Sequence, residues 1–183
     1  QFIQVQRGLG ASALGISSVG GTMNMVTKST EAQKGGSAYF GIGNDGFRKY
    51  SVSFSTGLMD NGWAITFMGS LNTGDGYVKG TNYEGWTYFG NISKVINDHH
   101  KLSLTAFGAP QWHNQRSTMH YIEDYKNSPD GGRFNNGYGY INGEAVGSGY
   151  GYNYYHKPQV SLNHYWTIDE KSTLTTSLYG SMA

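Results

Sequence analysis

Six histidines are the residues best suited to metal chemistry, but their spacing does not predict a metal site. They are His99, His100, His113, His120, His156 and His164. A protein zinc site needs nitrogen, sulfur or carboxylate ligands at short, regular spacing, and the chain has no cysteine. His99 and His100 fall in an expected tight turn, whereas His113 and His120 share a long loop where they could meet a metal chelate. We therefore expect no bound metal and no cofactor.

Catalytic motifs are equally weak. Gly8, Gly10 and Ala13 imitate the glycine-rich loop that binds dinucleotides, but that loop must open a helix. Gly15 and Gly20 would break a helix here, because glycine is a poor helix former. Neither Ser-x-x-Lys nor Gly-x-Ser-x-Gly occurs, and the absence of cysteine excludes a thiol nucleophile and a disulfide framework. We therefore expect a protein that is not an enzyme.

Aromatic residues among glycine and asparagine mark residues 111–156 as the segment most suited to binding. Tyrosine mixed with small polar residues is typical of adaptable binding surfaces, and long ordered loops are often functional. The same tyrosines could simply pack the loop against its neighbours, so both interpretations stay open. For the binding interpretation, the candidate ligand contacts are Trp112, His113, Tyr138 and Tyr140, with Arg116 as a positioning group.

The composition favours a membrane β-barrel. The 183 residues include 28 Gly and 15 Tyr, only 14% are charged, and the net charge is +1. That charge balance excludes a strongly basic nucleic-acid binder. No apolar run reaches the length of a transmembrane helix, and no signal peptide is recognisable. The chain starts without Met and stops inside an alternating pattern, so we expect both ends to be cut from a longer protein.

Most of the chain alternates with a period of two, which predicts β-strands. Seven strands are expected, at residues 37–42, 49–58, 63–72, 86–93, 101–106, 159–166 and 173–182. One face of each is apolar and the other is rich in Ser, Thr, Asn and Gly, with few Lys or Glu. A soluble β-sandwich also alternates, but this polar face better fits the crowded, wet lumen of a barrel. We expect an all-β chain, a fragment of a large antiparallel transmembrane barrel.

The lengths of the connections predict two different ends. Tight turns are expected at residues 59–62, 97–100 and 169–171, and longer loops at 73–83 and 111–156, although the connection at 44–46 is short. Short turns on one side and long loops on the other are typical of outer-membrane barrels. We therefore place Asn61 and Asp98 on the periplasmic side and Gly76 and Asn136 outside. Tryptophans at strand ends fit an aromatic girdle.

The first 28 residues resemble the end of the plug domain of TonB-dependent outer-membrane receptors. The resemblance rests on three blocks in the family's order and spacing: IQVQRG at 3–8, SALG at 12–15 and GGTMNMVTK at 20–28. The sequence departs from the family pattern at Leu9, which replaces a proline, at Gln4, which replaces an acid, and after Leu14, where a tyrosine is missing. The plug-motif residues implied are Arg7, Gly8, Gly20, Gly21 and Asn24.

The resemblance implies a function as well as a division of the chain. Residues 1–35 would be the C-terminal end of the plug and its linker, and residues 36–183 the first strands of the barrel. The implied function is TonB-dependent import of a scarce nutrient (siderophore, cobalamin, oligosaccharide or peptide) across the bacterial outer membrane. The implied partners are outer-membrane lipid, the imported ligand and TonB, which would bind an N-terminal segment absent here; a surface lipoprotein stays open. The alternative is a non-transporting surface protein, such as an adhesin or a carbohydrate-binding domain.

Overall fold

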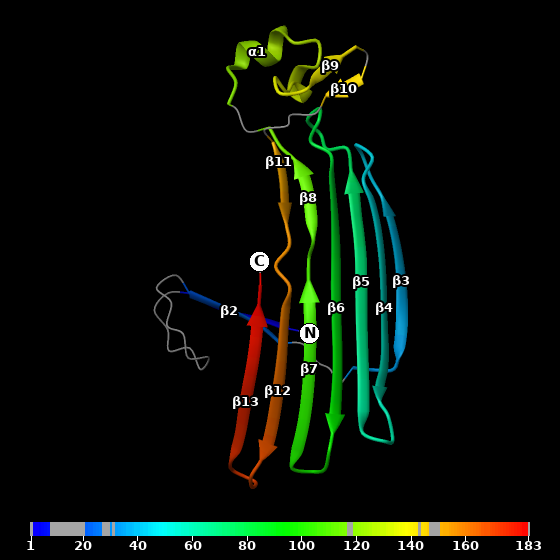
Figure 1. Cartoon of the computed structure of the whole chain (residues 1–183), viewed down its shortest axis with the longest axis vertical. Coiled ribbons are helices and arrows are strands. Elements are labelled where there is room, and N and C mark those ends of the chain that lie inside the picture. Colours follow the sequence, from blue (N-terminus) through cyan, green and yellow to red (C-terminus); the bar gives the residue numbers. More distant parts are fainter. Residues whose placement is uncertain are drawn as a thin grey trace.

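The structure is a computed structural model that describes residues 2–7, 21–26, 30, 32–116, 119–142, 144–146 and 151–182. Within these ranges the chain is predominantly antiparallel β-sheet, which confirms the predicted all-β class (Figure 1). Its α-helix, α1, covers only Ile122–Asn127. None of the described helices combines the length and the apolar character needed to cross a bilayer.

One nine-stranded antiparallel sheet dominates the structure. Its main path runs in the order β13-β12-β7-β6-β5-β4-β3, and the seven predicted strands are all found on it. Their bounds are β3 Gly35–Ile42, β4 Arg48–Leu58, β5 Trp63–Gly74, β6 Tyr83–Val95, β7 His100–Gly108, β12 Gln159–Thr167 and β13 Thr173–Ser181. Two short strands, β8 (Gln111–Asn114) and β11 (Tyr152–Tyr155), extend the sheet beyond β7 and β12. The edge strands β3 and β13 do not pair with each other, so the sheet is open.

Two small antiparallel sheets lie outside the large one. Strand β9 (Gly139–Ile141) pairs with β10 (Glu144–Val146). Strand β1 (Phe2–Arg7) pairs with β2 (Gly21–Val26), so two of the plug-like blocks are neighbours in space. Their register sets Arg7 opposite Gly21 and Gln4 opposite Asn24. Gly8 and Gly20 lie outside the described residues, and the division into plug and barrel parts stays a prediction.

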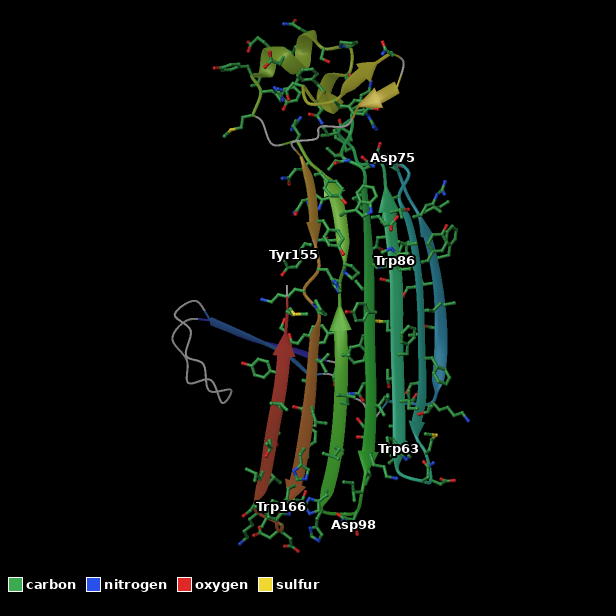
Figure 2. The ribbon with its side chains drawn as sticks, in the orientation of Figure 1. Trp63, Asp75, Trp86, Asp98, Tyr155 and Trp166 are labelled. Atoms are coloured by element: carbon green, nitrogen blue, oxygen red, sulfur yellow. The ribbon has the colours of Figure 1, made fainter. Side chains whose placement is uncertain are left out.

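The short and the long connections between strands lie at opposite ends of the sheet, as the sequence predicts. The turns that join β4 to β5, β6 to β7, and β12 to β13 are short and share one end of the sheet (Figure 1). Gly62 has a φ of 77° in the first of them, a backbone conformation that glycine adopts without strain. The longer connections share the opposite end, where Figure 2 places Asp75, far from Asp98.

Burial on the two faces of the sheet is the reverse of that in a soluble protein, because large apolar side chains are exposed and small polar ones are buried. Large apolar side chains such as Val52 and Phe54 are more than half exposed, at 53% each. The buried residues are mostly small and polar: Ser93 is 0% exposed and Asn91 2%, and Ala64 is the one buried hydrophobic residue among those described. We call the side bearing Phe54 the apolar face and the side bearing Asn91 the polar face.

Hydrogen bonds between side chains stabilise the centre of the polar face. Asn91 donates its amide to Ser103 Oγ over 2.9 Å and to Thr105 Oγ1 over 2.7 Å. Ser93 donates to Asn91 Oδ1 over 2.8 Å, and its hydroxyl also contacts Ser103 Oγ. Because both polar atoms of the Asn91 amide have partners, this residue can be buried without the cost of an unsatisfied group.

Candidate functional site

The end of the sheet that carries the longer loops is covered by a small folded unit, residues 119–142 and 144–146, which we call the head (Figure 1). It contains α1, the 3-10 helix η1 (Gly131–Arg133), β9 and β10. The head contacts the β5–β6 loop through the backbone: Lys79 N–H donates to the Arg133 carbonyl over 2.9 Å. Asn135, only 4% exposed, donates its side-chain amide to the Lys79 carbonyl over 2.7 Å.

Two ion pairs also join the head to neighbouring loops. Lys79 Nζ pairs with Asp130, and Arg133 pairs with Asp45 in the β3–β4 turn. The Arg133 guanidinium also lies 4.9 Å from the ring centroid of Tyr77. These charged groups are partly exposed, so each pair contributes only about 0–1 kcal/mol. Their main effect is to fix the position of the head over two connections, the β5–β6 loop and the β3–β4 turn.

The loop is shorter than the sequence predicts, because β8 and β11 occupy both of its ends. Trp112 lies directly opposite Tyr154, and Asn153 opposite His113, in a regular antiparallel ladder. Pro110 separates β7 from β8, and Pro158 separates β11 from β12. Proline has no N–H to donate to a β-ladder, which explains why both strands are interrupted at these positions.

A first hollow, of about 510 Å³, lies between the head and the β5–β6 loop. Its lining includes Asp75, Lys79, Asn82, Asn114, Arg133 and Tyr138. The Tyr138 ring packs against Gly80, whose φ is 72°, and an added Cβ at Gly80 would clash with this ring. Both signs of charge line this hollow, so it can accept a polar ligand with hydrogen-bonding groups.

A second hollow, of about 530 Å³, lies beside the first. Four of the residues that line it lie on the polar face according to the cross-strand register: Asn72, Tyr83, Gln111 and His113. Trp112 also borders the hollow. Asn114 borders both hollows and donates its amide over 2.9 Å to Oδ1 of Asn82, which borders the first.

The five predicted ligand contacts do not converge on one place. Trp112 and His113 border the second hollow, and Tyr138 borders the first. Arg116 packs inside the head, where it donates to the Phe134 carbonyl over 3.1 Å and lies over the Tyr125 ring. Tyr140 belongs to the short strand β9. Their role in ligand binding stays a prediction.

Several polar residues around the hollows, the asparagines and Tyr83, are not among those predicted from the sequence. Asn72 and Tyr83 lie at the loop ends of β5 and β6. Asn82 directly precedes β6, and Asn114 is the last residue of β8, where it pairs with Tyr152. The alternation of side chains along β5 could have indicated Asn72. It belongs to the residues of β5 that point to the polar face, and it lies where β5 meets a long loop. A polar residue at such a position lies on the polar face at the loop end of the sheet.

Two of the six histidines, His100 and His164, form a stacked pair. His100 Nδ1 and His164 Nε2 are 3.1 Å apart near the tight turns, and His120 packs edge-on against Tyr125 and Phe134 in the head. Within the part of the chain that the structure describes, no three His, Asp or Glu side chains are grouped as a metal site would require. His113 borders the second hollow, whereas His120 belongs to the head.

Family models, curated proteins and solved structures give no match to the chain, and the inference of function therefore rests on its own residues.

Proposed function

We propose that this chain forms part of the wall of a β-barrel in the bacterial outer membrane, and that the barrel imports a scarce nutrient with energy from TonB. The observation that carries the proposal is the reversed burial. Phe54 and Val52 are exposed on one face, while Asn91 and Ser93 are buried on the other. Exposed apolar area costs about 25 cal/mol per Å² in water, and a bilayer removes that cost. The polar face suits a wet lumen.

Aromatic residues at two levels of the apolar face support a bilayer on that side. Trp86 lies toward the loop end, whereas Trp63 and Trp166 lie near the tight turns (Figure 2). Trp63 lies directly opposite Lys94 of β6. Lys94 is eight residues along β6 from Trp86, so eight residues separate the levels of the two tryptophans. Eight residues span about 27 Å along a strand, and a tilt of about 40° reduces this to roughly 20 Å of height. That height is close to the apolar band of about 25 Å in outer-membrane barrels.

Import, rather than a static surface role, is supported by the plug-like blocks and by the position of the hollows. The blocks at residues 3–8 and 20–28 overlap β1 and β2, which pair with each other. The hollows open at the loop end, which would face the exterior if the tight turns are periplasmic. The ligand would be a siderophore, cobalamin, oligosaccharide or peptide, and TonB and outer-membrane lipid would be partners.

The test compares uptake by cells with and without TonB, each producing the full-length protein. Growth is measured with a ferric siderophore, cobalamin, an oligosaccharide or a peptide as the limiting nutrient. We expect growth on at least one of these nutrients to need both the protein and TonB, and the protein to fractionate with the outer membrane as a heat-modifiable band. Outer-membrane location without TonB-dependent growth would instead favour a non-transporting adhesin or carbohydrate-binding protein.

A further inference from the structure

The second hollow reaches bare backbone at Gly85, one of the residues that line it. Asn72 lies directly opposite Gly85 on β5, and Gln111 lies directly opposite it on β8. Directly opposite residues point to the same side of a sheet. A Cβ added at Gly85 would have the Gln111 Cβ, at 3.7 Å, as its one described neighbour within 4 Å outside the adjoining residues. Two amide side chains therefore flank an open gap above this glycine.

The polar side chains around the gap at Gly85 lack the partners found at the centre of the polar face. There, polar side chains bond one another across strands, as Asn91 does with Ser103 over 2.9 Å. Around the gap, the side chains of Asn72, Gln111 and His113 have no hydrogen-bond partner among the residues that the structure describes. All three are at least partly exposed, so their donors and acceptors are available to a ligand.

The polar-face lining of the second hollow includes no Asp, Glu, Lys or Arg. Glu84 also borders the hollow, but it lies on the apolar face, and its Oε1 accepts the indole N–H of Trp86 over 2.8 Å. Trp86 is two residues further along β6 and therefore lies on the same apolar face. Lys49, directly opposite Asn72 on β4, does not line the hollow. The hollow therefore favours a ligand that is uncharged in the part it holds.

Tyrosine rings lie beside the two amides. Tyr83 lines the hollow and is two residues from Gly85, so both have the same face of β6. Tyr155 lies directly opposite Gln111 on β11 and is 49% exposed. The row from Asn72 through Gly85 and Gln111 to Tyr155 crosses successive strands, which lie about 4.8 Å apart, so it spans about 14 Å. This length exceeds one sugar ring.

These groups match the chemistry of a sugar chain. A side-chain amide both donates and accepts hydrogen bonds, as a sugar hydroxyl does. The face of a tyrosine ring packs against the C–H groups on one side of a sugar ring. An anionic ferric siderophore needs positive charge, which the polar-face lining does not supply. The charged ends of a peptide would find no partner there either.

We infer that the second hollow binds a neutral oligosaccharide, with Asn72 and Gln111 hydrogen-bonded to its hydroxyl groups and Tyr155 packed against a sugar ring at the edge. The inference rests on the proposed function, because it names the nutrient that the barrel imports. It keeps His113 as a predicted ligand contact, whereas the register places Trp112 on the apolar face, opposite Glu84.

The test measures binding by calorimetry to the purified full-length protein in a detergent without a sugar headgroup. The probes are short neutral oligosaccharides from starch, xylan, mannan and fructan, and ferric enterobactin is the anionic comparison. We expect at least one neutral oligosaccharide to bind, and to bind more tightly than ferric enterobactin.

Variants locate the binding. Gly85→Val places a branched side chain in the open gap and should weaken oligosaccharide binding at least about tenfold. Gly90→Val is the matched control, because Gly90 lies on the apolar face of the same strand, where an added Cβ meets no described atom within 4 Å. It should bind like the wild type. Asn72→Ala and Gln111→Ala should each weaken binding roughly tenfold. The heat-modifiable band shows whether each variant folds.

Two results would overturn the inference. If the wild type binds none of the neutral oligosaccharides, or binds ferric enterobactin more tightly, the hollow is not a site for neutral sugars. If an oligosaccharide binds the wild type, Asn72→Ala, Gln111→Ala and folded Gly85→Val equally, it binds elsewhere. Binding needs no TonB, so either result leaves the proposed import to the growth test. Failure of TonB-dependent growth with binding intact would remove import and leave the sugar site.

Discussion

Asn135 of the head and Lys79 of the β5–β6 loop are joined by a hydrogen bond of 2.7 Å from the asparagine amide to the lysine carbonyl. Asn135 Oδ1 also accepts from the Gly137 N–H over 3.1 Å, so this single buried side chain organises its own loop and attaches it to the next. The walls of the first hollow belong to these two loops, and its shape therefore depends on Asn135.

Replacing Asn135 should loosen the head without unfolding the sheet. Asn135→Ala removes the part-buried hydrogen bond to the Lys79 carbonyl and the one from the Gly137 N–H, and each bond is worth about 1 kcal/mol. Asn136→Ala is the control, because Asn136 is exposed. Hydrogen exchange of the β5–β6 loop in the full-length protein should rise in the first variant and stay unchanged in the second. Equal exchange in the two variants would show that the head is attached by other contacts.

Arginine at neighbouring positions of β4 tests which face meets lipid. Phe54→Arg should impair insertion, because an arginine near the bilayer midplane costs about 2–4 kcal/mol, while Ser53→Arg should insert almost normally. Phe54 lies opposite Phe67 on the apolar face, and Ser53 bonds Ser37 on the polar face. The fraction of heat-modifiable protein measures the effect. Equal loss in both variants would argue for a soluble sandwich.

The hydrogen-bonded centre of the polar face should be a main source of stability. Asn91→Ala removes the partner of Ser103, Thr105 and Ser93, and we expect a loss of about 1–3 kcal/mol. Asn163→Ala is the comparison, because Asn163 accepts a single bond from the exposed Ser177 and should cost less. The temperature at which the folded band disappears on a gel reports the difference, and the opposite ranking would contradict it.

Cysteine labelling tests the orientation. The chain has no cysteine, so each introduced thiol is unique within it. A membrane-impermeant maleimide should label intact cells with Asn136→Cys but not with Asn61→Cys, because the two positions lie at opposite ends of the sheet. Both should be labelled after the outer membrane is permeabilised. Labelling of position 61 alone in intact cells would reverse the assignment.

Tyr138 tests whether the first hollow binds the imported nutrient. Tyr138→Ala should weaken binding of the nutrient found in the uptake test by ~2 kcal/mol, roughly thirtyfold, if this ring is a central anchor. Tyr121→Ala is the control, because Tyr121 is 81% exposed and does not border the hollow. Calorimetry on purified full-length protein gives both affinities. Unchanged affinity in Tyr138→Ala would leave that ring a packing role only.

The sequence predicted the long strands because their alternation is local and their turns are short. It did not predict β11, because Tyr152 and Tyr154 on one face and Tyr155 on the other hide the alternation. Helix α1 also gave no signal, since Tyr121 stands at its N-cap instead of Ser, Thr, Asp or Asn. The hollows depend on contacts such as Arg133 with Asp45, between residues far apart in the chain.

Pro110 and Pro158 mark the base of the hairpin of β8 and β11. The ladder of β7 and β12 ends below them, and the upper ladder resumes above in the same register, with β8 also paired to β6. A change in the length of the upper hairpin therefore leaves the register of the lower wall untouched. New binding segments can be grafted there, or acquired in evolution, while the part of the sheet that sets the alternation of faces keeps its sequence.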